Sequence, residues 1–339
     1  MLNGKEAFAI SDCPLETEVD AAKEAALDMT LDWVYQAAGY RQGMIHYLLL
    51  SGREPFANLK TLRRISSYAG SSGLSVAVHT NAFWASSREE ALDTLQQLPA
   101  VDSLTLCVNP ACQPAVPFNH IEHALWASKE LHRHCRVELF GDGAERDLAL
   151  MQERLGSLVN SLDDIAFGGF SPSDHRLPSA EPAASPCSGF AYPVVLPDGK
   201  VVACEGSRSN VMHSCPLCLG SLQERSLKEI LDSAELNPVL HIIRIWGPQK
   251  LVALMREYGF GDLLPHFASE ETHCELCHKL LSTLKVVEML ERIFEDSQLL
   301  HTLAYARMHY LGEPAMIQQY RLNGSESIDL ASMALFTDW

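Results

Sequence analysis

The stretch CSGFAYPVVLPDGKVVAC, residues 187–204, carries the pattern from which the organisation of this chain can be read. Two short runs rich in strand-forming residues, YPVVL and KVVA, flank the turn signal PDG. Glycine adopts positive φ without a steric penalty, so Gly199 suits the turn of a β-hairpin. We therefore predict a hairpin that carries Cys187 and Cys204 at its two outer ends.

A second pair of cysteines, Cys274 and Cys277, stands at Cys-x2-Cys spacing further along the chain. Together with Cys187 and Cys204 it supplies four thiolates, a set that suits a 4Fe–4S cluster or a tetrahedral zinc ion. The sequence contains ten cysteines and no secretory signal pattern. We therefore expect a cytoplasmic, reducing compartment and a metal site rather than a disulfide framework.

Cys215 and Cys218 form another Cys-x2-Cys pair, for which three interpretations stay open. They are candidate additional ligands of a second cluster, a redox pair, or, with the later Cys-x2-Cys pair, a zinc site. The stretch between the two pairs is longer than in common zinc ribbons, so zinc is the alternative interpretation. His273 and His278 flank the later pair. We expect both on the surface beside a ligand loop, and a histidine ligand stays open as the alternative.

The composition limits the classes of partner. The chain of 339 residues has room for one large domain and a smaller one. No run approaches the roughly 18 apolar residues of a membrane span, so we expect no membrane partner. The formal net charge of −17 argues against a nucleic-acid partner, because phosphate binding needs a basic face. Such a charge is compatible with a basic peptide substrate.

Strand-like and helical segments alternate through the first half of the chain. Regular alternation predicts parallel strands joined by right-handed helical crossovers, as in a (β/α) barrel or part of one. The series opens with a helical segment, residues 18–38, so we expect the first barrel strand to be absent. The five predicted strands are residues 44–50, 74–80, 103–108, 136–140 and 165–167.

The predicted fold class is α/β, with an incomplete (β/α)6, TIM-like partial barrel followed by a small cysteine-rich domain and C-terminal helices. A linker rich in Pro, Ser and Ala separates the barrel from the cysteine-rich domain. The predicted boundaries are 1–170 for a barrel without its first strand, 171–186 for the linker, 187–278 for the cysteine-rich domain and 279–339 for the helices.

The carboxyl ends of the predicted strands carry polar and glycine-containing sequences, at residues 51–55, 79–81, 107–109 and 141–143. Ligands of such sheets bind at these ends. Each sequence alone also has a plain structural explanation, as a turn or as a helix cap. Glu54, for example, would favour the dipole of a helix that starts near Ala57.

Taken together, the strand ends and the cysteines resemble radical S-adenosylmethionine enzymes that carry a SPASM or twitch auxiliary-cluster domain. Residues 51–55, SGREP, resemble the family's Gly-Gly-Glu-Pro motif, which contacts the amino group of S-adenosylmethionine. Residues 78–81, VHTN, resemble its Thr-Asn-Gly strand end. The pattern of Cys187, Gly199 and Cys204 is similar to the opening of the auxiliary domain.

The resemblance covers about residues 15–280. It includes the segments LGSL (219–222) and SLKEIL (226–231), which follow Cys218. It implies an auxiliary 4Fe–4S cluster on the four cysteines named first. It also implies an S-adenosylmethionine cleft, lined by Gly52, Glu54, Pro55, Thr80, Asn81 and Asn109.

The sequence departs from the family at one decisive point. Family members hold the catalytic cluster with a Cys-x3-Cys-x2-Cys motif just after the first barrel strand, and that spacing does not occur in this sequence. Cys13 is the only cysteine before Cys107. We therefore expect either a chain truncated ahead of Met1, which we prefer, or a pseudoenzyme. In both cases S-adenosylmethionine should bind weakly and should not be cleaved.

Two functions fit this combination. The resemblance implies a role in the maturation of a ribosomally made peptide or of a protein, as in many family members with this auxiliary domain. The alternative is a non-catalytic protein with a structural zinc site that binds a peptide or a partner enzyme through the open side of an incomplete barrel.

Overall fold

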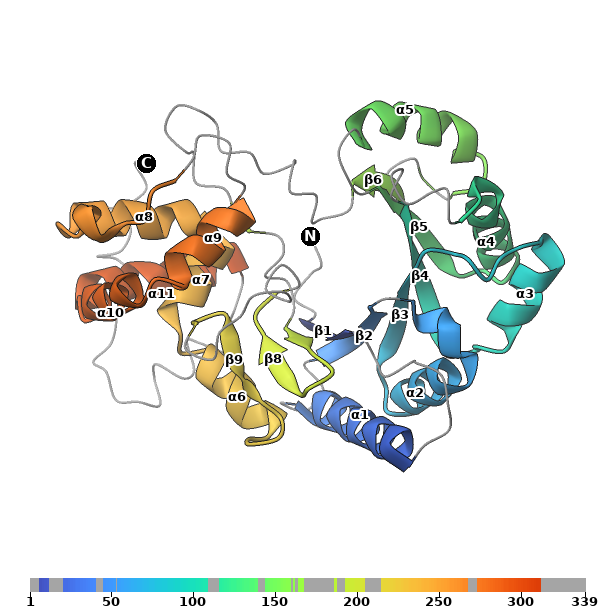
Figure 1. Cartoon of the computed structure of the whole chain (residues 1–339), viewed down its shortest axis with the longest axis horizontal. Helices are drawn as coiled ribbons and strands as arrows, with labels where there is room; N and C mark the ends of the chain where they lie inside the picture. Colours follow the sequence, from blue (N-terminus) through green and yellow to red (C-terminus); the bar gives the residue numbers. More distant parts are fainter. Residues whose placement is uncertain are drawn as a thin grey trace.

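The protein, seen in a computed structural model, is built on one long β-sheet with helices on one side of it and a helical bundle at one end (Figure 1). The sheet has nine strands among the described residues. The structure describes residues 6–11, 21–40, 45–52, 54–108, 116–139, 144–159, 161, 164–167, 186–187, 193–204, 215–267 and 273–311.

The strands are β1 (Glu6–Ser11), β2 (Ile45–Ser51), β3 (Ser75–Thr80), β4 (Val101–Val108), β5 (His134–Leu139), β6 (Ile165–Phe167), β7 (Val194–Val195), β8 (Lys200–Val202) and β9 (Cys218–Ser221). Their order in the sheet is β6-β5-β4-β3-β2-β1-β7-β8-β9. Strands β1 to β6 are parallel and follow the order of the chain, whereas β7, β8 and β9 pair antiparallel.

A helix connects each barrel strand to the next, and Figure 1 shows these helices together on one side of the sheet. They are α1 (Ala21–Gly39), α2 (Leu59–Ser71), α3 (Arg88–Gln96), α4 (Phe118–Glu130) and α5 (Ala144–Leu155). The predicted α/β class and the partial (β/α) barrel are therefore confirmed.

The first barrel strand, which we expected to be absent, is present as β1. It runs parallel to β2, with Phe8 opposite Leu48 and Ile10 opposite Leu50. The prediction of five strands, with a barrel that lacks its first strand, was wrong. Alanine is a poor strand former, and the run EAFAIS contains two of them. The strand is defined by pairing with neighbours on both sides, which local propensity does not report.

The predicted hairpin of β7 and β8 is confirmed. Its turn needs Gly199, which has a φ of 79° and donates its N–H to the carbonyl of Leu196 at 2.9 Å. Strand β7 also pairs in parallel with β1, opposite Ala9 and Ile10. The hairpin therefore continues the barrel sheet instead of forming a detached unit.

The two faces of the barrel strands differ in character. Val76 and Val78 are fully buried in the core that includes the outer helices. The alternate residues face the other side, where His79, Arg136 and Glu138 are half-buried. Arg136 and Glu138 form an ion pair there at 3.2 Å. A small apolar cluster from β2, β7 and β8 lies on the same side, so the inner face of the partial barrel is only partly polar.

Helices that follow α6 (Leu227–Ala234) form a second apolar core, whereas α6 itself packs into the barrel core through Leu227, Ile230 and Leu231. The helices of the second core are α7 (Pro238–Trp246), α8 (Pro248–Glu257), α9 (His273–Leu281), α10 (Leu284–Ile293) and α11 (Ser297–Leu311). Each of α7 to α11 contributes to this core, for example through Ile242, Leu251, Leu280, Leu290 and Leu303. The predicted C-terminal helices therefore pack with the cysteine-rich part. None of the described helices is long and apolar enough to span a membrane.

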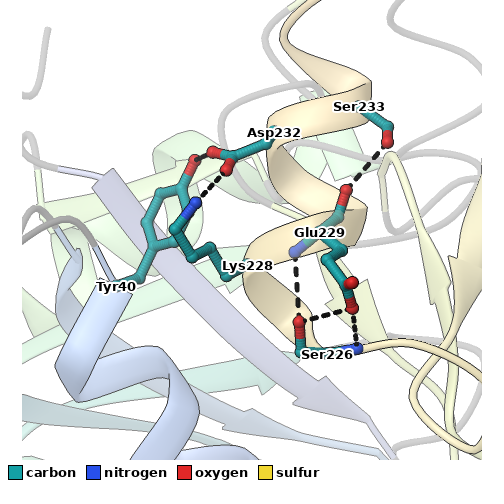
Figure 2. A network of polar contacts seen from close by, with 6 residues as sticks. All are labelled: Tyr40, Ser226, Lys228, Glu229, Asp232 and Ser233. Atoms are coloured by element: carbon teal, nitrogen blue, oxygen red, sulfur yellow. Dashed lines mark hydrogen bonds and ion pairs between the residues drawn. The ribbon is translucent and has the colours of Figure 1, made fainter.

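Helix α6 docks on α1 of the barrel through the polar network in Figure 2. A capping box begins α6, in which Ser226 and Glu229 satisfy each other's backbone N–H groups. Two turns along, Tyr40 at the end of α1 donates its hydroxyl to Asp232 at 3.2 Å. Asp232 also pairs with Lys228 on the same helix. These contacts join the barrel to the second half of the chain.

Gln36 adds a hydrogen bond whose loss can be measured. Its Oε1 accepts from the N–H of buried Leu227 at 2.7 Å. Gln36→Ala should lower the free energy of unfolding by about 1 kcal/mol, because that N–H loses its partner. Asp32→Ala is the matched control, since it removes only the exposed bond from Gln36 Nε2. Urea denaturation checks both variants. Equal losses, or no loss in Gln36→Ala, would contradict the assigned role.

Candidate functional site

The four cysteines predicted as metal ligands line one small cavity beside α9. Cys187, Cys204, Cys274 and Cys277 surround a space of about 20 Å³, together with aliphatic side chains. They come from three separate segments of the chain. The fold therefore gathers thiols that lie far apart in the sequence.

Each thiol is held by a different local feature. Cys204 follows β8 directly and is buried. Cys187 donates its backbone N–H to the carbonyl of Ile243 on α7 at 3.2 Å. Cys274 and Cys277 lie in the first turns of α9, where residues three apart share one face of a helix.

Burial disfavours ionisation of the two thiols on α9. It raises the pKa of Cys274 to about 11, with smaller contributions from Cys187 and Glu275. It also raises the pKa of Cys277 well above the ordinary value, and the neighbouring thiols, Cys204 first among them, add to this rise. Soft metals bind thiolates, so a metal that enters this cavity must displace protons.

Cys215 and Cys218 occupy different surroundings. Cys215 is buried and close enough to Cys277 to contribute to its raised pKa. Cys218 instead has Lys200 and Asp198, at the hairpin turn, among its charged neighbours. Among the described residues that line the cavity, neither of the pair appears. The hairpin thiols thus line the cavity with the thiols of α9, whereas Cys215 packs in the same core outside the lining and Cys218 lies near the hairpin turn.

Two imidazoles also line the cavity, those of His273 and His278. We expected both on the surface, and that was wrong for His273, which is 8% exposed. Helical spacing turns residues four apart to one side, so His273 shares a face with Cys277, and Cys274 with His278. The cavity thus offers nitrogen as well as sulfur donors. Within the described ranges, no three such side chains are already gathered as ligands of one ion.

Glu54 joins the carboxyl ends of β2 and β3. Its carboxylate accepts hydrogen bonds from the Thr80 hydroxyl at 2.7 Å, the Asn81 N–H at 2.8 Å and the Phe56 N–H at 3.1 Å. The last contact makes Glu54 the N-cap of the short 3-10 helix η2 (Pro55–Asn58), which begins two residues before the helix start that we expected near Ala57. Most of the accepting capacity of this carboxylate is therefore used within the protein.

Two aromatic residues that sequence reasoning missed complete this cluster. Trp84 donates its indole N–H to the Thr80 hydroxyl at 2.9 Å and stacks on Phe56, with ring centroids 4.3 Å apart. Ala82 adopts a φ of 65°, and its N–H also donates to the Thr80 hydroxyl. Burial raises the pKa of Glu54, and its three hydrogen bonds oppose the rise. These contacts make the strand ends rigid.

The other residues predicted to bind S-adenosylmethionine differ in backbone conformation, burial and hydrogen bonding. Gly52 has a φ of 138°, Pro55 is buried, and Asn81 accepts from the Phe83 N–H at 2.9 Å through its side chain. Asn109 lies outside the described residues. The assignment of these residues to S-adenosylmethionine stays a prediction.

The comparisons with known proteins concern the cysteine-rich part most directly. The SPASM family model, described as an iron–sulfur cluster-binding domain, matches residues 187–264. The chain therefore carries a SPASM-type domain, which includes the hairpin thiols, while Cys274 and Cys277 follow the matched range. A comparison with curated protein sequences gives no match.

Among solved structures, the chain is similar to coproporphyrinogen III oxidase (HemN) from Escherichia coli, described as a radical SAM enzyme. The TM-score is 0.30 and the sequence identity 12%, over 50% of this chain and 45% of that chain. The alignment thus spans less than half the length of that enzyme.

Replacement of Glu54 tests the strand-end cluster. Glu54→Ala leaves the N–H groups of Asn81 and Phe56 and the Thr80 hydroxyl without their acceptor, so we expect a loss of about 3 kcal/mol in the free energy of unfolding. Glu122→Ala is the control, because Glu122 forms a partly exposed ion pair with Arg154 that should contribute under about 1 kcal/mol. Thermal and urea unfolding compare the two. Similar losses would show that Glu54 does not hold the strand ends together.

Replacement of Cys204 tests the metal centre. Protein reconstituted anaerobically with iron and sulfide should bind about four irons per chain, and Cys204→Ala should abolish this binding. Cys135→Ala is the matched control, because Cys135 is equally buried but lies in the barrel core, where burial raises its pKa to about 12. Iron, sulfide and zinc analysis gives the readout. Stoichiometric zinc without iron would rule out the cluster.

Proposed function

We propose that this chain is an iron–sulfur protein of the radical S-adenosylmethionine/SPASM type that binds an auxiliary cluster but no cofactor-cleaving cluster. The observation that carries the proposal is the group of four thiols around one cavity, two of them within the SPASM match and two on the following helix. The parallel partial barrel that precedes them is the architecture that the sequence resemblance implies.

The residues at the cavity fit a 4Fe–4S cluster in their chemistry. Cysteine thiolates are the usual ligands of such clusters, and four of them provide one for each iron. Leu217 and Ile243 line the same cavity and limit the access of water, which influences the reduction potential of a cluster. A cluster bound there would supply one-electron redox chemistry.

The connection between β1 and α1 supports the second half of the proposal. In the family this connection carries Cys-x3-Cys-x2-Cys, and here it consists of residues 12–20, which lie outside the described residues. Cys13 stands at the first position of that spacing, whereas Thr17 and Asp20 stand at the other two. Since β1 and α1 flank this connection, the departure from the family spacing lies within residues 12–20.

Weak binding of S-adenosylmethionine is expected from the single thiol in this connection and from the hydrogen bonds of Glu54. One thiol is too few to hold a cluster that anchors the amino and carboxylate groups of the cofactor. The Glu54 carboxylate, which would be left to bind the amino group, already accepts three hydrogen bonds. The carboxyl ends of β2 and β3 could therefore form the wall of a cleft, but they would contribute little free energy to the binding of S-adenosylmethionine.

A role in peptide or protein maturation is the most specific form of this proposal. It rests on the SPASM domain and on the family resemblance, and the net charge of −17 would favour a basic peptide in a cytoplasmic setting. Under this proposal the chain binds the peptide and carries a redox centre, without cleaving S-adenosylmethionine itself.

One observation favours the alternative, a non-catalytic peptide- or partner-binding protein with structural zinc. The thiol cavity of about 20 Å³ has room for about one water molecule. A single zinc ion would fit that space with less rearrangement than a cluster of four irons and four sulfides. The metal analysis of Cys204→Ala and its control separates these two functions.

The β1–α1 connection gives a test by restoration. The chain as it stands should release no 5′-deoxyadenosine from S-adenosylmethionine under dithionite. Thr17→Cys combined with Asp20→Cys recreates the family spacing and should add about four irons per chain. Glu16→Cys combined with Val19→Cys is the control, with the same number of thiols at an unsuitable spacing. Iron analysis and electron paramagnetic resonance give the readout.

Two outcomes would contradict the proposal. Several turnovers of 5′-deoxyadenosine by the unaltered chain would show that the cofactor is cleaved without the three-cysteine motif. Equal iron binding by the restored variant and its control would show that this connection is not the degenerate cluster loop.

A further inference from the structure

A groove of about 530 Å³ opens on the helical half of the structure, where the α6–α7 junction faces α10 and the start of α11. Its volume lies in the range of sites that bind small ligands or side chains, roughly 300–1,000 Å³. It is separate from the thiol cavity and from the strand ends. The lining residues are Cys215, Pro216, Leu236, Asn237, Pro238, Val239, Val287, Glu291, Phe294 and Leu300.

The walls of the groove are mainly apolar. Val287, Phe294 and Leu300 are only partly buried although they carry large apolar side chains. Leu236, at the rim, is 74% exposed. Apolar side chains gathered around a hollow, with polar residues among them, are typical of a binding site and unusual for a plain surface.

Two polar side chains of the groove, those of Asn237 and Glu291, could orient a bound ligand. Asn237 uses its side-chain oxygen to cap α7, where it accepts from the Val239 N–H at 3.0 Å. Its amide N–H₂ group is therefore the part that can donate to a ligand carbonyl. Glu291 is exposed and is the charged residue among the described residues of the lining. An amide donor and a carboxylate beside apolar walls match a peptide with a basic side chain.

Cys215 connects the groove to the metal centre. It lines the groove and belongs to the same apolar core as Cys204 and Cys277, which line the thiol cavity. The groove and the cavity therefore share one supporting core.

We propose that this groove binds a peptide segment in which a branched apolar side chain stands beside a basic residue. The apolar side chain fills the hollow between Leu236 and Phe294, the peptide carbonyl accepts from Asn237, and the basic group faces Glu291. The negative charge of the whole chain, −17, adds to the preference for a basic peptide. The inference rests on the proposed function only in taking the ligand to be a peptide.

Photo-crosslinking tests the location and the charge preference together. The probes are acetylated pentapeptide amides with a central photo-leucine, flanked by two lysines or by two glutamates. The lysine probe should label residues 236–239 and 287–300, identified by mass spectrometry, about fivefold more than the glutamate probe. Leu236→Ser should reduce this labelling about tenfold, because the apolar contact is lost. Glu291→Lys should reverse the preference between the probes.

Leu284→Ser is the matched control, because Leu284 is 61% exposed on the same helix α10 but does not line the groove. It should leave labelling unchanged. Equal labelling by both probes, or labelling unaffected by Leu236→Ser and Glu291→Lys, would overturn the proposal. A shift from dimer to monomer in Leu236→Ser would overturn it in favour of a second copy of the chain as the occupant.

Metal analysis of the same preparations keeps this proposal distinct from the proposed function. Zinc in place of iron, with labelling of the groove intact, would refute the cluster and leave the groove assigned. A loaded cluster without selective labelling of the groove would refute the groove alone.

Discussion

The parallel pairing of β1 is the contact on which the rest of the structure depends. On one side β1 pairs with β2 and begins the barrel, and on the other side it pairs with β7 and carries the hairpin. The hairpin leads to Cys204, while the carboxyl end of β1 leads into the connection that contains Cys13. One short strand thus holds the hairpin that leads to the thiol cavity against the barrel. Besides this pairing, Leu49 of β2 packs with Val194 and Val202 of the hairpin, and α6 docks on α1.

Local sequence patterns were sufficient to predict much of the secondary structure. They failed where tertiary contacts determine whether a segment forms a strand or a side chain is buried. The hairpin was predictable because its turn needs positive φ at Gly199, and the long periodic segments gave the other barrel strands to within a few residues. Strand β1 was missed because its alanines carry no strand signal and its stability comes from two neighbours. His273 was misplaced because its burial follows from α9 beginning at that residue, which the sequence between the two Cys-x2-Cys pairs does not reveal.

The two candidate sites, the strand ends around Glu54 and the thiol cavity, differ in whether the protein itself satisfies their polar groups. At the strand ends, the Glu54 carboxylate is satisfied by three donors of the protein, so a ligand would have to compete with existing hydrogen bonds. At the thiol cavity, burial disfavours ionisation of Cys274 and Cys277, a cost that a bound metal ion would offset. Its binding should also stabilise the second core, because Cys204 and Cys277 belong to that core.

A barrel whose strand ends are held by hydrogen bonds within the protein keeps that arrangement with no ligand bound. The helical half carries a thiol cavity and an apolar groove, and Cys215, which lines the groove, packs in the same core as Cys204 and Cys277 of the cavity. Since both features depend on the packing of α7, α9 and α10, a substitution that loosens this core should change the cavity and the groove together. The proposed metal site and the proposed peptide groove would therefore share one supporting core.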